Sequence, residues 1–70
     1  MFIIKKLDGG LKVLDGVMGV DFTPPHKATF LLKNGEAMTF NLQCETSEYI
    51  EDALIRGFKT NEYFKEVESV

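Results

Sequence analysis

Residues 27–43 read KATFLLKNGEAMTFNLQ, and this stretch decides the fold. Two runs rich in aromatic, aliphatic and threonine residues flank the dipeptide Asn34-Gly35, which is a strong local signal for a β-hairpin. A two-residue type I′ turn needs positive φ at both central positions, and Asn and Gly tolerate that conformation best. We therefore predict a hairpin in which Lys33 faces Glu36 as an opposite-charge pair.

This register determines which side chains share a face of the hairpin, because side chains alternate across a strand. It pairs Leu32 with Ala37, Leu31 with Met38, Phe30 with Thr39 and Thr29 with Phe40. One face then carries Leu31, Met38, Phe40 and Leu42, and the other carries Ala28, Phe30, Leu32 and Ala37 with Thr39 and Asn41. A sheet that is covered on one side shows a cleaner alternation, so we expect some cover on both faces.

The second of these faces is the predicted interaction surface. Two interpretations of it stay open. It lines the interior of a curled sheet closed by a bent strand around Gly16 and Gly19, or it forms an exposed patch that pairs with a second protein or a second copy. The candidate interface residues are Ala28, Phe30, Leu32, Ala37 and Thr39.

An amphipathic helix is predicted from about Ser47 to Phe58, because apolar residues recur there at helical spacing. The apolar stripe consists of Tyr49, Ile50, Ala53, Leu54 and Phe58. Glu48, Glu51 and Asp52 lie in the first turns, where the helix dipole favours anions. Gly57 and the polar residues after it indicate the end of the helix.

The remaining segments are less regular. Residues 2–7 predict a strand, and residues 11–22 predict a bent strand or two short strands joined at Asp15-Gly16. Thr23-Pro24-Pro25 predicts a crossover, since proline has no N–H for a ladder. The aromatic tail, residues 61–68, fits a short helix or an edge strand, and its Glu and Lys residues favour the helix.

Together these elements predict one α+β domain over residues 1–70. Its core is a small twisted antiparallel sheet of about four strands, with barrel-like curling as an alternative, packed against one C-terminal amphipathic helix. A chain this short buries only ~60% of the surface that its unfolded form exposes. Cys44 is the only cysteine, so no intramolecular disulfide can form, and oligomerisation is the remaining common source of stability.

Candidate chemistry is sparse. A Cys44–His26 pair could in principle form a nucleophile and its base, but a structural thiol and an ordinary loop histidine are the favoured interpretations. The acids at the start of the helix lack the spacing of a calcium loop, and the glycines match neither the dinucleotide nor the P-loop pattern. We expect no catalysis, no metal, no cofactor and no small-molecule substrate.

Charge is split along the chain. Residues 1–43 carry five lysines against four acids, and residues 44–70 carry three basic residues against seven acids, which gives +1 and −4 for the net −3. The absence of Arg from the first part makes nucleic acid an improbable ligand, because phosphate binding rests on clustered basic residues. A free thiol and no apolar run of membrane length favour a cytoplasmic protein without membrane contact.

The favoured function is therefore a non-catalytic protein-interaction module that self-associates through the two-faced hairpin, as a homodimer in the simplest case. One alternative is a small barrel that binds single-stranded nucleic acid on a curled sheet. In size and composition the chain also resembles compact accessory or inhibitor proteins of bacteria and their phages, although no motif carries that resemblance.

Overall fold

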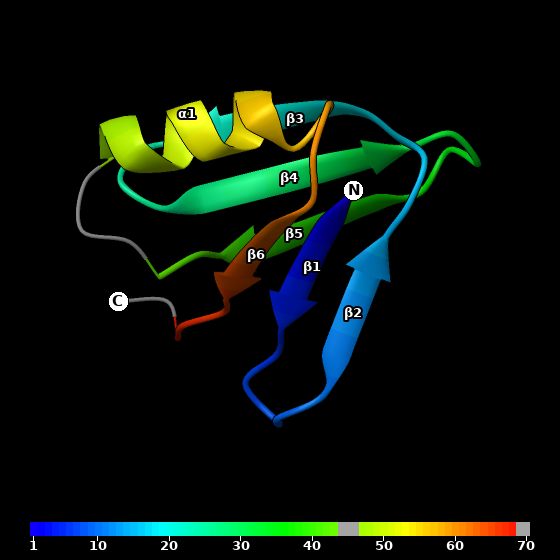
Figure 1. The fold of residues 1–70 in the computed structure, drawn as a ribbon. Helices are drawn as coiled ribbons and strands as arrows, with labels where there is room; N and C mark the ends of the chain where they lie inside the picture. Colours follow the sequence, from blue (N-terminus) through cyan, green and yellow to red (C-terminus); the bar gives the residue numbers. More distant parts are fainter. Residues whose placement is uncertain (44–46, 69–70) are drawn as a thin grey trace.

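The computed structural model describes residues 1–43 and 47–68. Within these ranges the chain forms six strands in two three-stranded sheets and one helix, α1, at one side (Figure 1). The elements are β1 (Phe2–Lys5), β2 (Leu11–Leu14), β3 (Val17–Thr23), β4 (Lys27–Leu32), β5 (Ala37–Asn41), α1 (Ser47–Arg56) and β6 (Glu62–Lys65). The predicted α+β class is confirmed, whereas the strands are more numerous than the predicted four and β6 follows the helix.

The first sheet, called the mixed sheet below, has the order β2-β1-β6. β1 pairs antiparallel with β2 and parallel with β6. The prediction of a purely antiparallel sheet is therefore wrong, and so is the preference for a helix in the tail. β6 forms a strand because the backbone of β1 has a second edge to satisfy, and an edge strand tolerates Glu and Lys.

The second sheet, called the antiparallel sheet below, has the order β3-β4-β5. The hairpin between β4 and β5 forms where the sequence predicts it, but its loop is different. The Leu32 N–H donates to the Glu36 carbonyl oxygen at 2.9 Å, which encloses residues 33–35. Gly35 has φ of 90°, and no described non-glycine residue has a positive φ, Asn34 included. This is a three-residue loop with glycine in the left-handed position instead of a type I′ turn.

The extra loop residue shifts the register by one. Phe30 lies opposite Met38 and Ala28 lies opposite Phe40, so the predicted pairs of Phe30 with Thr39 and Thr29 with Phe40 are wrong. A slip of one residue moves side chains of one strand to the other face. The inward face of this hairpin collects Ala28, Phe30, Leu32, Met38, Phe40 and Leu42. The hairpin is therefore one-sided, and the predicted two-faced hairpin does not occur.

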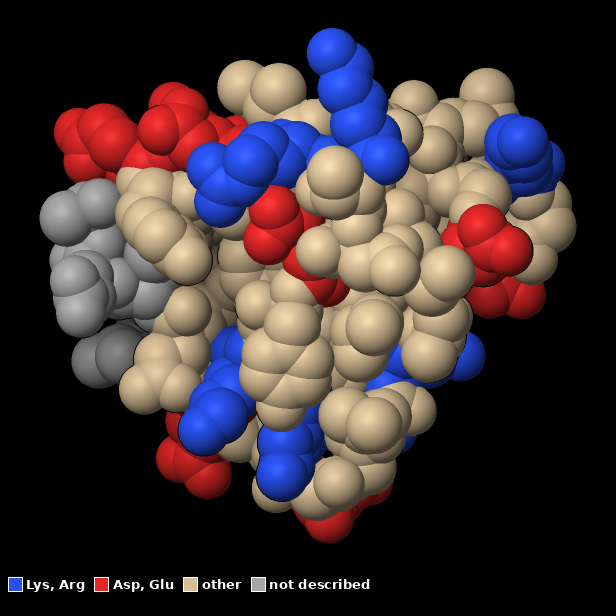
Figure 2. Space-filling view, in the orientation of Figure 1, with Lys and Arg blue, Asp and Glu red and all other residues tan. Residues whose placement is uncertain are grey.

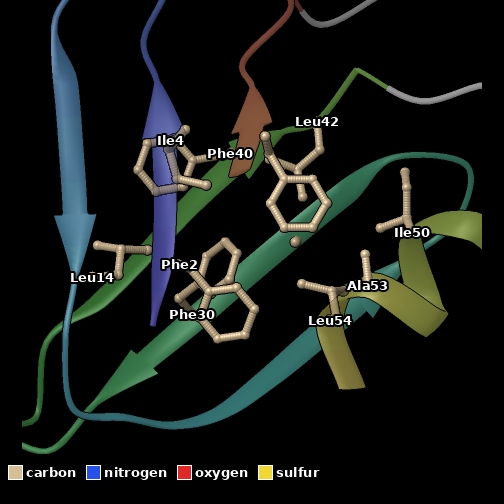
Figure 3. Close-up of a cluster of buried hydrophobic side chains, with 11 residues drawn as sticks. Phe2, Ile4, Leu14, Phe30, Phe40, Leu42, Ile50, Ala53 and Leu54 are labelled. Carbon is tan, nitrogen blue, oxygen red and sulfur yellow. The ribbon is translucent and has the colours of Figure 1, made fainter. Parts of the chain in front are cut away.

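The core lies between the two sheets and is closed on one side by α1 (Figure 3). Phe30 is fully buried at its centre, with its ring centroid 5.1 Å from that of Phe2. The helix contributes Ile50, Ala53 and Leu54 to this cluster. The predicted burial of the apolar stripe is confirmed for these three residues. Two other predicted members, Tyr49 and Phe58, are largely exposed.

The connections between consecutive strands agree with the predictions only in part. Of the two alternatives predicted for residues 11–22, the structure has two separate strands, because β2 ends at Leu14 and β3 begins at Val17. The predicted crossover at Thr23-Pro24-Pro25 is wrong, since Thr23 pairs with Lys27 and the segment is a hairpin turn. Among the described residues, an isolated bridge between Leu42 and Glu66 joins the two sheets at one end, and the barrel is not closed.

Candidate interaction surface

The outward face of the mixed sheet is built from alternate residues of its three strands. Phe2 and Ile4 of β1 point into the core, so Ile3 and Lys5 point out. The register places Ile3 opposite both Val13 and Tyr63. It places Lys5 opposite both Leu11 and Lys65. These six residues, Ile3, Lys5, Leu11, Val13, Tyr63 and Lys65, are called the outer patch below.

The apolar members of the outer patch are exposed. The exposed fractions are 63% for Leu11, 53% for Val13 and 51% for Tyr63, while Ile3 at their centre is half-buried. Strands in one sheet lie ~4.8 Å apart, so side chains in a row across them touch. Figure 2 shows the result as an uncharged area over β6, β1 and β2, with lysine or arginine groups below it. The outward face of a one-sided sheet is ordinarily polar, which makes this continuous apolar face unusual.

Charge is uneven across the outer patch. Lys5 and Lys65 lie side by side in the register, and none of the six outward residues, all of which the structure describes, is acidic. Two like charges in adjacent positions repel each other when nothing lies between them. An anionic group on a docked molecule would relieve that repulsion.

Ion pairs occupy the two ends of the mixed sheet instead. Arg56 Nε donates to Glu62 Oε1 at 2.8 Å, and this hydrogen bond raises the pKa of the Arg56 guanidinium. In the β1–β2 turn, Asp8 Oδ1 accepts the Gly10 N–H at 2.8 Å and Lys6 Nζ lies 3.8 Å from Asp8 Oδ2. The Gly10 hydrogen bond, followed by the Lys6 charge, lowers the pKa of Asp8. These two acids are therefore already engaged, and within residues 1–43 and 47–68 neither Lys5 nor Lys65 forms an ion pair.

The antiparallel sheet has a more ordinary outward face. At its centre Thr29 lies opposite Thr39, and their hydroxyl oxygens are hydrogen-bonded at 2.9 Å. Leu31, 46% exposed, is an apolar side chain on the same face. The centre of this face is therefore a hydroxyl pair, whereas the central row of the outer patch consists of Val13, Ile3 and Tyr63.

The structure separates the five residues that the sequence groups as an interface. Ala28 and Phe30 are completely buried within the chain, and Leu32 is half-buried beside them. Ala37 and Thr39 are exposed on the opposite face of the hairpin. This separation follows from the one-residue shift of register, and of the two interpretations it favours an interior position for Phe30.

Of the two residues with candidate catalytic chemistry, the structure describes His26 but not Cys44. His26 lies in the turn before β4, where its carbonyl oxygen accepts the Leu42 N–H at 2.8 Å. Cys44 lies outside the described residues, as do Glu45 and Thr46, so no Cys–His geometry is defined. Within residues 1–43 and 47–68, no group of three or more His, Cys, Asp or Glu side chains could hold a metal ion. The helical part of these ranges contains no segment long and apolar enough to cross a membrane.

The outer patch is not among the predicted interface residues, although the sequence contains a signal for it. Phe2-Ile3-Ile4 is continuously apolar, and Leu11 and Val13 alternate with Lys12 in the next strand. An uninterrupted apolar run in a short strand places apolar side chains on both faces. The sequence of β1 therefore predicts an apolar side chain on its outward face as well as on its inward face.

Comparisons with protein-family models, with curated proteins and with solved structures found no match to this chain. The class of protein is therefore described from its fold and its surface alone. It is a small sheet-rich α+β domain with one apolar, lysine-bearing outer sheet face.

Proposed function

We propose that this chain is a small non-catalytic interaction module that self-associates through the outer patch. The observation that carries the proposal is the row Val13–Ile3–Tyr63, which spans three strands without a polar residue. Exposed contiguous apolar surface is uncommon on monomeric proteins and marks interaction sites. Burying these side chains in a second copy would remove them from water at ~25 cal/mol per Å² of apolar surface.

Charge supports a second copy as the partner. The lysines of the outer patch call for an acidic counterpart, and residues 44–70 carry seven acids against three basic residues. Six side chains on three short strands cover less than the ~800 Å² per partner of a standard interface. We therefore expect weak association that depends on protein concentration.

The test is sedimentation velocity over a concentration series extending to high micromolar protein. A Leu11→Gln/Val13→Thr variant removes exposed apolar surface, and Val13→Thr keeps the branched shape that a strand favours. The matched control is Leu31→Gln, which removes a comparably exposed leucine from the antiparallel sheet. We expect the wild type and the control to gain mass with concentration while the double variant stays monomeric. A wild type that remains monomeric throughout would overturn the proposal, and so would a double variant that associates normally.

A second candidate is binding of single-stranded nucleic acid on the same face. Tyr63 is a half-exposed aromatic ring on the same face as Lys5 and Lys65, and base stacking beside cationic groups is the usual pattern for such ligands. Fluorescence anisotropy with mixed-sequence oligonucleotides at low salt tests it. Binding that weakens steeply with salt and is reduced in a Tyr63→Ala variant supports this candidate. No change in anisotropy at low salt removes it.

A further inference from the structure

The outward face of α1 has the complementary composition to the outer patch. Glu51 and Asp52 follow Glu48 by three and four positions, and Ile55 follows them by four and three positions, so these residues share one stripe of the helix. All four are exposed, and Ile55, at 68%, is the most exposed large apolar side chain among the described residues. An isoleucine among three acids faces solvent here.

The helix cannot rotate this stripe inward. Ile50, Ala53 and Leu54 occupy the opposite side of α1 and are buried in the core between the sheets (Figure 3). Turning Ile55 inward would expose those three side chains to water. The acidic stripe is thus a fixed outward surface, and acidic groups gather over the start of α1 in Figure 2.

We propose that the acidic stripe of α1 in one copy docks on the outer patch of the next copy, head to tail. This inference rests on the proposed function and specifies its second surface. Ile55 would cover the apolar row that includes Val13 and Tyr63, while the acids of the stripe would neutralise Lys5 and Lys65. The ten residues of α1 span about 15 Å. The mixed sheet offers about 13 Å along its strands and about 10 Å across them, which matches one short helix.

Charge argues against the symmetric alternative, in which two outer patches face each other. That arrangement would place Lys5 and Lys65 of both copies in one contact with no acid from either patch. Like charges that are brought together in a desolvated contact repel each other and weaken binding. A contact between different surfaces avoids this repulsion, and repeating it produces rings or open chains instead of a closed pair.

Charge-reversal variants test the inference. Lys5→Glu/Lys65→Glu alters the outer patch, and Glu51→Lys/Asp52→Lys alters the acidic stripe without touching the core. Lys27→Glu/Lys59→Glu changes two exposed lysines elsewhere and has the same net charge as the patch variant. Circular dichroism and urea unfolding establish that each variant is folded before sedimentation is measured.

We expect each of the patch and stripe variants alone to associate at least about tenfold more weakly than the wild type. The equimolar mixture of the two should regain high-mass species, because reversed patches then meet reversed stripes. The Lys27→Glu/Lys59→Glu control should associate as the wild type does. Wild-type association should weaken as salt rises, since the screening length falls below ~10 Å above 0.1 M.

The possible failures are distinguishable. A stripe variant that still associates like the wild type, while the patch variant does not, overturns the head-to-tail contact and leaves the proposed function standing. A wild type that never associates overturns both. A mixture that stays monomeric shows that the reversed charges do not meet, and it also overturns the head-to-tail contact.

Discussion

The substitution Gly57→Ala tests how the helix is joined to the core. Gly57 directly follows α1, and its N–H donates to the Ala53 carbonyl oxygen at 2.9 Å. Its φ is not positive, so alanine can adopt the backbone conformation. An added Cβ, however, would lie 2.7 Å from Cδ1 of the Phe2 ring and closer still to its Cε1 and Cζ. The glycine is therefore required by the close approach of an aromatic ring.

The ring has little freedom to yield. Phe2 is 1% exposed, and its centroid lies 5.1 Å from that of Phe30 and 5.6 Å from that of Phe58. Overpacking of this kind costs about 1–3 kcal/mol, and the reduced freedom of the unfolded chain offsets about 0.4–1 kcal/mol. A net loss of about 1–2 kcal/mol lowers the Tm of a domain of this size by about 4–16 °C.

Urea and thermal unfolding followed by far-ultraviolet circular dichroism measure the loss. Gly19→Ala is the matched control, because Gly19 has no positive φ and no atom within 4 Å of an added Cβ, and we expect it to change stability by less than about 0.5 kcal/mol. In a double-mutant cycle, Phe2→Leu should relieve the overlap, so the pair should cost at least ~0.5 kcal/mol less than the sum of the single changes. A Gly57→Ala protein as stable as the wild type, or strictly additive costs, would refute this account.

Three further predictions concern the turns and the core. Gly35→Ala should cost about 1–2 kcal/mol in urea unfolding, because φ of 90° is strained for any residue with a Cβ; equal stability would show that the loop can change its form. Phe30→Ala should cost about 3–5 kcal/mol and accelerate amide exchange throughout both sheets, since the ring is fully buried; slow exchange in either sheet would contradict its central position. Nuclear magnetic resonance titration should place the pKa of Asp8 below its ordinary value, because the Gly10 N–H and Lys6 both favour the carboxylate, and Lys6→Ala should raise it. Because the folded pKa is the lower one, the stabilisation from Asp8 is complete above the unfolded pKa and is lost as pH falls through the folded value. An Asp8 that titrates at its unfolded pKa would show that Asp8 does not stabilise the fold.

The hairpin shows what sequence reasoning can and cannot supply here. The site of the turn follows from Asn34-Gly35, but two loop types place a glycine in the left-handed conformation, and they differ by one residue in register. The information that selects the observed loop is also in the sequence. Only the three-residue loop puts Phe30 and Phe40 on the same face. Choosing the register that separates apolar from polar side chains would have avoided the two-faced interpretation.

The mixed sheet depends on partners that are distant in the chain. Local propensity at Glu62 to Lys65 favours a helix, and only the backbone of β1 makes the strand preferable. The outer patch was missed for a related reason. The local pattern indicates an apolar outward side chain in β1, but Leu11, Val13 and Tyr63 become neighbours only through pairing with β1, which no local pattern specifies.

The central place of β1 has a consequence for how the chain acquires its structure. Phe2 pairs with Glu62, so all the elements from β2 to α1 must be synthesised before this strand gains its second neighbour. The hairpins of β3, β4 and β5 involve nearby residues and can close early, whereas pairings that are distant in sequence form slowly. On the ribosome, β1 and β2 therefore emerge before β6, and β1 has an open edge until β6 pairs with it. Nascent chains that stop before β6 would expose that edge to one another, and an unpaired strand edge promotes aggregation.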